Sequence, residues 1–483
     1  MSSADSCIAP YITKEVSFEF RGRTYGFALS HGLFSSAGID RGSRFLLRVF
    51  SKLLDESEGG KNGGSRAKGE TLFPVLRAAG DPAAGRAQPP ETLSVLDAGC
   101  GCGALGICAG TALRDLAGKG AGDGTTGTVP ALRVRAQDRD ELARLFTEYN
   151  GRRNGLAGPE LEAHTEALLA GPAEAAWDLI LSNVPAKAGK PVLEDFIGRS
   201  AGMLKSGGLV LAVVVNPLAP WFRDGIITRG FTPLHDEPGT DHTVFAWRGA
   251  SGAAVVDGGG EAAGVFPNEA AYYRGGGNFE MEGIRYRIDA VHGAAGFDRI
   301  DAAVSAAARL TGKLAGKIPA CLASNPAVLV HEPDQGHFPA WFARRFTPDT
   351  GYGFVLSGRN ILSLEAARRN LEKAADGRAA WIKTAAVVDL AISREELALP
   401  GGGYGLVVLF PDLVPGTNRI AAYWEGIAAL LAENGIAIAA LNASAAEKFD
   451  RGKTAGPARF TRLGDFRRNG FRALAYQRNA GPS

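Results

Sequence analysis

The sequence predicts an α/β protein of two tandem domains, each a mostly parallel, twisted sheet with helices on both faces. Three observations predict this fold. The 483 residues exceed the size at which one hydrophobic core stops growing, so at least two domains are expected. Short apolar runs alternate with segments of helical spacing, as in sheets whose strands are joined by helices. Part of the N-terminal segment also recurs in the second half of the chain.

The internal repeat joins positions that are 261 residues apart. Nine N-terminal residues are identical to the residue 261 positions later, without a gap and in a strand-turn-strand pattern. They are Tyr11, Phe18, Glu19, Gly22, Tyr25, His31, Gly32, Ile39 and Asp40. Because so many ungapped identities over some thirty positions are improbable by chance, we interpret the chain as two copies of one unit.

The domain boundary is expected in a segment rich in Gly and Ala, residues 250–270, which has the composition of a linker. The prediction is a first domain at residues 1–250, with a leader at 10–50 and a core at 91–250. A linker at 251–264 and a second domain at 265–483 follow. Residues 55–91 and 118–130, rich in Gly and Pro or in Gly and Thr, are expected to be surface insertions.

Composition and charge limit the class of protein. The formal net charge of +2 does not demand a polyanionic partner, but the last 39 residues hold nine Lys or Arg against three Asp or Glu. That tail is a candidate contact for phosphates, with an ordinary solvated surface as the alternative. The five cysteines form neither a disulfide framework nor a metal-ligand pattern, so we expect a reducing, cytoplasmic compartment and no metal. No secretion signal or membrane-spanning segment is recognised.

Buried strands and amphipathic helices alternate through the first half. The strands are predicted at residues 93–98, 132–137, 177–182 and 208–215, and the helices at 139–150 and 190–203. In a parallel sheet of this kind, ligands bind outside the carboxyl ends of the strands. The glycine-rich segment VLDAGCGCGALGI, residues 95–107, lies at such an end.

This glycine-rich turn is the first candidate site. Gly99, Gly101 and Gly103 lack Cβ atoms, so the backbone can turn tightly and a ligand can approach it closely. A packing role without a ligand is the alternative. Asp97, two residues before the first glycine, can reach a charged amino group but would repel a pyrophosphate. Asp138, after the next strand, can accept both hydroxyls of a ribose. Together they favour a cationic nucleoside with a free ribose over a dinucleotide.

These motifs resemble class I S-adenosylmethionine-dependent methyltransferases. The series LDAGCGCGALG, an acid after the second strand, and DLILSNVPAKAGK is similar to the "methyltransferase small" family, which includes the guanine-N2 methyltransferases of ribosomal RNA. The upstream segment ALSHGLFSSAGIDRGSRFLL, residues 28–47, matches that family's leader. The resemblance covers about residues 10–250. It implies tandem Rossmann-like methyltransferase domains and S-adenosylmethionine as the cofactor.

The resemblance also implies site residues. The turn residues would line the methionine and ribose side, Asp138 would hold the ribose, and Glu166 would accept from the adenine amino group. Two leader residues would close over the cofactor. The cofactor-binding residues implied are Phe34, Ser43, Asp97, Gly99, Gly101, Gly103, Asp138, Glu166 and Asn183.

The resemblance implies catalytic positions at Asn183, Val184 and Pro185, followed by Ala186 where family members usually carry an aromatic or aliphatic residue. Methylation of an amino nitrogen in this family requires two hydrogen-bond acceptors, the Asn183 side-chain oxygen and the Val184 backbone carbonyl. They accept from the two hydrogens of the substrate NH₂ group. These bonds draw the nitrogen lone pair out of conjugation, so positioning and electrostatics supply the catalysis. Ala186 cannot stack on a base, a contact worth about 1–3 kcal/mol. A loop in an inactive, cofactor-binding domain is the alternative.

The second half is predicted to keep the fold and to lose the site. Strands are expected at residues 405–409 and 435–441, with a helix at 419–431 between them. In VLVHEPDQG, residues 328–336, Glu332 and Asp334 stand in for Gly99 and Gly101. Three further replacements remove the chemical positions: Val330 for Asp97, Gly358 for Asp138 and Phe410 for Asn183.

The function expected is an S-adenosylmethionine-dependent N-methyltransferase acting on the exocyclic amino group of guanine in ribosomal RNA, with the second domain as a possible RNA-binding element. One alternative is a methyltransferase that acts on a protein amide or a small molecule. Another is a non-catalytic RNA-binding or assembly protein with a residual cofactor site. A nucleotide-dependent dehydrogenase is disfavoured by Asp97 and by the G-x-G-x-G spacing.

Overall fold

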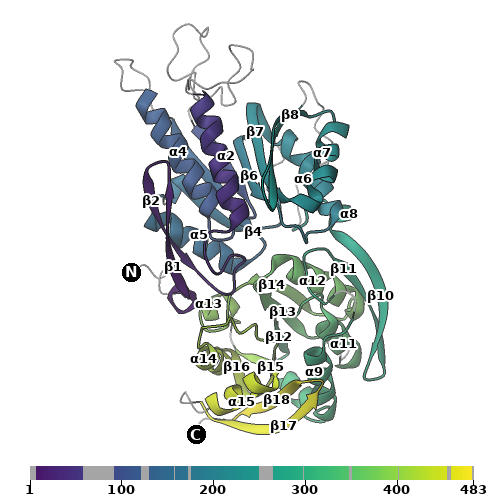
Figure 1. The fold of residues 1–483 in the computed structure, drawn as a ribbon. Coiled ribbons are helices and arrows are strands. Elements are labelled where there is room, and N and C mark those ends of the chain that lie inside the picture. Colours follow the sequence, from purple (N-terminus) through teal and green to yellow (C-terminus); the bar gives the residue numbers. More distant parts are fainter. Residues whose placement is uncertain are drawn as a thin grey trace. The chain divides into compact units, whose positions relative to one another are not determined.

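The computed structural model divides into two compact units, Met1–Ala271 and Tyr272–Ser483 (Figure 1). It describes residues 7–57, 92–120, 130–156, 158–171, 176–249, 265–296, 299–346, 351–400, 402–453 and 458–480. Most of the two predicted insertions and the predicted linker therefore lie outside the described residues. No helix in the described part is long and apolar enough to cross a membrane.

The first unit is built on a seven-stranded sheet in the order β5-β4-β3-β6-β7-β9-β8. The strands from β5 to β7 are parallel, whereas β9 is antiparallel to β7 and to β8. The strands are β3 (Thr92–Ala98), β4 (Ala131–Asp138), β5 (Leu161–Thr165), β6 (Trp177–Asn183), β7 (Leu204–Val215), β8 (Thr232–Pro238) and β9 (His242–Arg248). The carboxyl ends of β3, β4 and β6 therefore meet at one edge.

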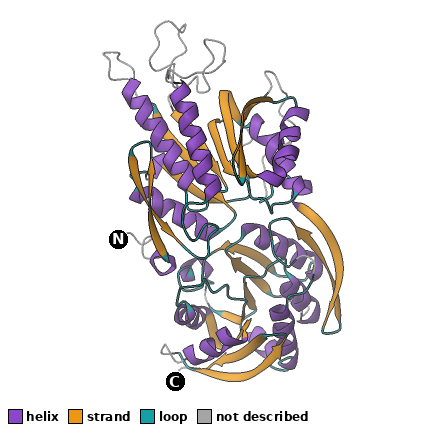
Figure 2. Cartoon of the chain, in the orientation of Figure 1, coloured by secondary structure: helices purple, strands orange, loops and turns teal. Residues whose placement is uncertain are grey.

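Helices cover both faces of this sheet (Figure 2). Aliphatic side chains of α2 and α4 share one core with β3, β6 and β7, and α5 packs on β4 and β5. On the other face, Phe196 of α6 and Phe222 of α7 meet Trp247 edge-on, at ring-centroid distances of 6.3 and 5.7 Å. The helices are α2 (Arg41–Ser57), α4 (Ala104–Gly120), α5 (Glu141–Arg153), α6 (Lys190–Gly202) and α7 (Ala219–Thr228), with short turns η1 (Ala9–Tyr11), η2 (Gly158–Glu160) and η3 (Asn216–Leu218).

A separate hairpin of β1 (Lys14–Phe20) and β2 (Arg23–Leu29) precedes α2. Asn150 of α5 fastens this hairpin to the glycine-rich turn. Its Oδ1 accepts from Ala28 N at 2.8 Å, and its Nδ2 donates to Ala28 O at 3.0 Å and to Cys102 O at 2.9 Å. One buried amide thus replaces a strand partner for β2 and also holds the turn after β3.

The second unit repeats this arrangement. Its hairpin of β10 (Tyr273–Met281) and β11 (Ile284–Val291) precedes a seven-stranded sheet in the order β14-β13-β12-β15-β16-β18-β17. The strands of the sheet are β12 (Ala327–His331), β13 (Gly353–Gly358), β14 (Trp381–Ala386), β15 (Tyr404–Leu409), β16 (Leu431–Asn442), β17 (Phe460–Arg468) and β18 (Phe471–Arg478). The helices are α8 (Glu269–Tyr272) at the unit boundary, α9 (Ala302–Lys313), α10 (Ile318–Ser324), α11 (His337–Phe346), α12 (Ile361–Ala375), α13 (Arg394–Leu397), α14 (Ile420–Leu430) and α15 (Ala443–Gly452).

The hydrogen bonds made by Asn150 also recur in the second unit. Asn370 of α12 accepts from Asp289 N at 2.8 Å and donates to Asp289 O at 3.0 Å and to Gln335 O at 2.8 Å. Asp289 lies 261 positions after Ala28, the spacing found in the sequence repeat. The two units therefore share a strand order and also a buried amide that joins hairpin to turn.

The predicted α/β fold with helices on both faces is confirmed in both units. The predicted strands and helices of both halves are present, with ends shifted by a few residues. The largest shifts are at β7 and β16, which begin four residues before the predicted strands. Both carry a break in register at their start, opposite Trp177 and Tyr404, where the regular apolar pattern is interrupted.

Candidate active site

The glycine-rich turn after β3 has a left-handed backbone at three positions. The φ angles are +82° at Gly99, +57° at Gly101 and +82° at Gly103, a region that side chains with a Cβ rarely adopt. Gly99 N and Cys100 N both donate to Gln137 O of β4, at 2.9 and 3.0 Å. This anchors the turn across the ends of β3 and β4 and leaves its outer surface as bare backbone.

Asp97 lies buried at the end of β3 with one carboxylate oxygen unpaired. Its Oδ2 accepts from Gly106 N at 2.8 Å, whereas Oδ1 has no hydrogen-bond partner among the described residues. Burial raises the pKa of Asp97 to about 7, and the neighbouring Asp138 carboxylate adds to the rise. A buried acceptor without a donor is costly, so Oδ1 is suited to an ammonium or hydroxyl group of a ligand.

Asp138 ends β4 beside the same turn. Its Oδ2 accepts from Gly101 N at 3.1 Å and its Oδ1 from Asp140 N at 3.1 Å. Burial raises the pKa of Asp138 to about 6. Two carboxylates and a strip of bare backbone thus converge at one place. This donor and acceptor set fits a cofactor with an amino group at one end and ribose hydroxyls at the other.

Asn183 ends β6 and its side chain is oriented by two residues at the start of α2. Nδ2 donates to Asp40 Oδ2 at 2.7 Å and to Ser43 Oγ at 3.2 Å, and Asp40 also accepts from Ser43 Oγ at 2.5 Å. With both donors committed on that side, Asn183 Oδ1 is left as an acceptor that has no partner among the described residues. Asp40 is a site residue that the sequence reasoning missed, although it stands out in the repeat and as the N-cap of α2.

The residues after Asn183 form a short loop that leads into α6. Val184 N donates to Val213 O at 3.0 Å, which extends the pairing of β6 with β7 by one residue. Pro185 O accepts from Ala188 N at 2.9 Å, and Pro185 and Ala186 are exposed. The peptide that joins Asn183 to Val184 is therefore fixed by the sheet, even though the family's first proline is missing.

Two of the residues implied by the resemblance have other surroundings. Phe34, in the loop after β2, is 82% exposed. Both carboxylate oxygens of Glu166 accept from Arg135 Nη2, at 2.8 and 2.7 Å, and Arg135 is itself buried. Because this ion pair occupies Glu166, the structure gives no support to its assignment to the adenine amino group. Ser43 lies beside Asn183 and Asp40, so its contacts are with the catalytic loop.

The cysteines of the turn do not form reactive thiolates. Burial raises the pKa of Cys102 to about 12 and holds the pKa of Cys100 well above its ordinary value. Within the described ranges, no group of three or more His, Cys, Asp or Glu side chains is placed to hold a metal ion. The turn therefore acts through its backbone and its carboxylates.

In the second unit, the matching positions carry side chains that close the site. Glu332 and Asp334 keep the left-handed backbone, with φ of +55° and +48°, at about 1–2 kcal/mol each. The Glu332 carboxyl group accepts from Arg359 N at 2.9 Å and lies against Gly358, where an added Cβ would meet it at 2.9 Å. Glu332 thus fills the space next to the position that matches Asp138.

Comparisons with known proteins bear on the fold and on the family of the first unit. Residues 86–223 match the model of the Methyltransferase small domain. A solved 16S rRNA guanine-N2 methyltransferase of T. thermophilus, in complex with AdoMet and guanosine, is 14% identical and covers 96% of this chain and 98% of its own, with a TM-score of 0.51. A ribosomal protein L11 methylase of Lactobacillus delbrueckii subsp. bulgaricus is 20% identical and covers 38% of this chain and 81% of its own, with a TM-score of 0.26. A search of curated proteins finds no match.

A class I fold with a glycine-rich turn between two acidic strand ends and an Asn-x-Pro loop defines an S-adenosylmethionine-dependent methyltransferase. More narrowly, residues 86–223 of the first unit are similar to the methyltransferase small domain. The resemblance found in the motifs is therefore confirmed, and with it the enzyme class and the cofactor. The roles of individual residues stay predictions.

The affinity for S-adenosylmethionine is expected to fall as pH falls below about 7. Asp97, whose pKa is raised to about 7, must be ionised to pair with the cofactor's ammonium group, so a proton is released on binding. The dissociation constant should rise by up to about tenfold per pH unit below the pKa. Calorimetry between about pH 5.5 and 7.5 measures it, with Asp97→Asn as the comparison, which should bind weakly at every pH. An equal dissociation constant across this range for the wild type would contradict the assignment.

The second unit should become more stable at alkaline pH when Glu332 is replaced by Gln. Burial raises the pKa of Glu332 to about 8, so its contribution to stability is complete below about pH 4.5 and is lost as pH rises through 8. Glu332→Gln is neutral at every pH. At about pH 8.5 it should raise the free energy of unfolding by an amount on the order of 4 kcal/mol, and with it the thermal midpoint, and near pH 5 it should have little effect.

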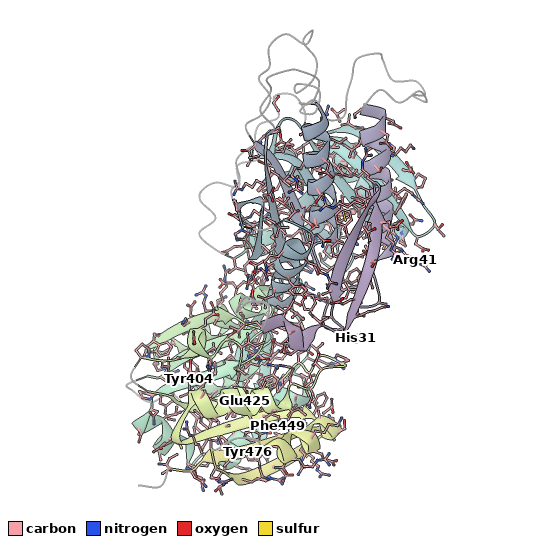
Figure 3. The ribbon with its side chains drawn as sticks, turned by 90° about the vertical axis from the view of Figure 1, so that its left-hand side faces the viewer. His31, Arg41, Tyr404, Glu425, Phe449 and Tyr476 are labelled. Atoms are coloured by element: carbon pink, nitrogen blue, oxygen red, sulfur yellow. The ribbon has the colours of Figure 1, made fainter. Side chains whose placement is uncertain are left out.

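The matched control for Glu332 is Glu425→Gln, which changes an exposed carboxylate on α14 (Figure 3). Its midpoint should equal that of the wild type at both pH values, because the side chain is not desolvated on folding. Scanning calorimetry of the full chain measures all three proteins. A rise for Glu332→Gln that is the same at acidic and alkaline pH would show that packing, and not ionisation, is responsible.

Proposed function

We propose that the first unit transfers a methyl group to the exocyclic amino group of guanine in ribosomal RNA. The observation that carries the proposal is the orientation of Asn183. Its Nδ2 is held by Asp40 and Ser43, so its Oδ1 is the free end of the amide at the carboxyl edge of the sheet. An acceptor in this place suits an NH₂ group of the substrate.

The backbone carbonyl of Val184 is the second acceptor of the proposed mechanism. Val184 N donates to Val213 O, so the peptide that joins Asn183 to Val184 is held by the sheet, and the Val184 carbonyl belongs to the next peptide, which leads to Pro185. Two acceptors bonded to the two N–H groups of the substrate draw the lone pair of the amino nitrogen out of the ring. S-adenosylmethionine supplies the methyl group on a sulfonium centre. The protein's contribution is to align the nitrogen with it.

The residues proposed to hold the cofactor are those of the turn. Asp97 Oδ1 would take the ammonium group, the backbone from Gly99 to Gly103 would lie along the methionine and ribose, and Asp138 would accept from the ribose hydroxyls. The unpaired Oδ1 and the absence of Cβ atoms support this assignment. For the adenine amino group we assign no residue, because Glu166 is paired with Arg135.

RNA as the substrate is supported by the T. thermophilus enzyme, which shares the two-unit fold and was solved with guanosine. At 14% identity that similarity shows a common fold only. Guanine as the methylated base and RNA as the substrate are therefore our proposal. An amide nitrogen of a protein is the second candidate. It is favoured by the exposed Ala186, which offers no ring to stack on a base. We propose a cytoplasmic location, which the five free cysteines support.

We propose that the second unit is a degenerate methyltransferase-like copy that helps to hold RNA. The equivalent amide clamps of Asn150 and Asn370 support the common origin. In the basic tail, Arg462 and Arg472 are paired with Asp465, whereas Arg467 and Arg468 are exposed on β17. The charge offered to a phosphate backbone is therefore smaller than the sequence count suggests.

Asn183→Ala is expected to abolish methyl transfer while the protein still binds the cofactor. Purified wild type should move labelled methyl from S-adenosylmethionine to ribosomal RNA from cells that lack the gene, and nucleoside analysis should identify N2-methylguanosine. The variant removes the oriented acceptor and should lose about a hundredfold or more in rate. If the labelled methyl group appears in ribosomal protein and not in RNA, the result favours an amide nitrogen of a protein as the acceptor. No transfer from wild type to either would contradict the proposal.

Asp40→Asn is expected to lower kcat and to leave the fold intact. Asn caps a helix about as well as Asp, but an amide has one acceptor oxygen, so it cannot accept from Gly42 N and also from Asn183 Nδ2 and Ser43 Oγ as the two carboxylate oxygens of Asp40 do. We expect kcat to fall about tenfold or more while the KM for S-adenosylmethionine changes less than about twofold. Ser43→Ala, which removes the longer 3.2 Å contact to Asn183, should cost less. Steady-state kinetics and thermal midpoints separate these effects. If kcat falls only in proportion to a lowered thermal midpoint, Asp40 has a purely structural role.

A further inference from the structure

We infer that a basic groove between α2 and the β8–β9 hairpin binds the phosphate backbone of the RNA strand that carries the target base. The inference rests on the proposed function, because it names where the substrate of that same site lies. The groove has a volume of about 510 Å³. It is lined by Arg41, Arg44, Phe45, Arg48, Gly239, Thr240, Asp241 and His242.

The cations of the groove form a stripe along one face of α2. Arg41, Arg44, Arg48 and Lys52 follow the spacing i, i+3, i+7 and i+11, which places them on one side of a helix. All four are exposed, and Figure 3 shows Arg41 at the outer surface of the first unit. At 1.5 Å per residue the stripe is about 16 Å long, enough for several successive phosphates of a single strand.

The carboxylates nearby neutralise two of these cations and leave two. Arg41 pairs with Asp241 at 3.1 Å, and Lys52 pairs with Glu237 at 3.1 Å. Arg44 donates through Nε to Ile39 O at 2.8 Å, and the guanidinium of Arg48 lies 4.8 Å from the centre of the Phe45 ring. In the part of the chain that the structure describes, neither Arg44 nor Arg48 has a carboxylate partner. Their charge is held in place and is open to an anion.

The position of the stripe also favours an anion. Arg41 and Arg44 lie in the first turn of α2, where the helix dipole is positive and acidic residues are the usual choice. The first turn of α2 contains no acidic residue. The Asp40 carboxylate at the N-cap already accepts from Gly42 N and Ser43 N, so the helix end needs no further anion. The positive charge of Arg44 is not required by the helix, and we assign it to a bound phosphate.

The groove begins at the catalytic loop. Asp40, the N-cap of α2, is bonded to Asn183 and immediately precedes Arg41. The opposite wall is held by Asn216, whose Nδ2 donates to Gly239 O at 3.1 Å and to Thr240 O at 3.0 Å. A strand that follows the stripe toward its N-terminal end therefore arrives at the acceptor for the target amino group.

The wall and the floor of the groove fit together closely. A Cβ added to Gly239 would lie 2.6 Å from the Phe45 ring, and one added to Gly42 would lie 3.2 Å from His242. At these two points the hairpin packs directly on α2. Since this contact is tight, the arginines project from a surface of fixed shape, which lowers the entropy lost on binding.

The test is the salt dependence of binding to a fluorescein-labelled, single-stranded oligoribonucleotide of about 12 nucleotides. The variant is the triple change Arg41→Gln, Arg44→Gln and Arg48→Gln in the full chain. Arg44 and Arg48 have no carboxylate partner among the described residues, so the loss of their two phosphate contacts should lower the slope of log K against log salt by about 1.4, at about 0.7 per contact. The KM for RNA should rise with the loss of affinity, whereas the dissociation constant of S-adenosylmethionine should not change.

The matched control removes three exposed arginines of the second unit by Arg285→Gln, Arg287→Gln and Arg309→Gln. The loss of charge is the same, so a general electrostatic effect would act on both triples. A second variant, Asp241→Asn, removes the carboxylate that pairs with Arg41 and should tighten binding and steepen the slope. It tests the groove even if the triple variant folds poorly, which the thermal midpoint reports.

The inference is overturned if both triples lose the same affinity, if Asp241→Asn does not bind more tightly, or if wild type does not bind the oligoribonucleotide. It is also overturned if poly-glutamate competes as well as RNA, since the groove would then be selective for acidic peptides. Transfer to RNA with an unchanged KM in the groove variant would overturn the inference and leave the proposed function standing. If the variant loses RNA affinity but wild type forms no methylguanosine, the inference about the groove is supported and the proposed function is contradicted.

Discussion

The left-handed turn that follows the first strand of each sheet is the constraint on which both units depend. In the first unit it bonds across to β4 through Gly99 N, and in the second Glu332 N bonds to Ser357 O at 2.7 Å. This turn lets the chain leave the strand and enter a helix while the strand end stays open. Glycine permits it without strain, and the second unit keeps it with Glu332 and Asp334 at positive φ. The shape of the turn is thus a property of the fold, and only its bare surface belongs to the cofactor site.

Much of this was predictable from local patterns. The alternation of apolar runs predicted β3, β4, β6 and β7, because strands buried on both faces are nearly continuous in apolar residues. The turn, Asp97 and Asp138 were predictable because each lies at the carboxyl end of a strand and the strands are parallel. Asn183 was recognised for the same reason. These are properties of short segments, and in a parallel sheet the ends of such segments meet at one edge.

What could not be predicted depends on contacts between distant residues. Asp40 orients Asn183 from 143 positions away, and its N-cap role was the one local signal for it. Glu166 was expected to meet adenine, but Arg135, on the neighbouring strand, takes both of its oxygens. Periodicity reports which face a side chain occupies and does not report its partner on that face. The partners of charged residues are therefore the part of a site that sequence patterns define least.

The two units differ most clearly in how their polar atoms are satisfied. At matched positions the first unit holds Asp97 with an unpaired buried oxygen, whereas the second has the apolar Val330. Asn183 keeps a free acceptor, and Phe410 has none to offer. A buried acceptor without a donor costs about 1–3 kcal/mol, so a fold that binds no ligand gains by removing it. The same reasoning explains why Asn370 persists, since its loss would leave the backbone of Asp289 and Gln335 without partners. At these matched positions the unsatisfied acceptors of Asp97 and Asn183 are suited to a ligand, whereas the satisfied amide of Asn370 is what the fold itself requires.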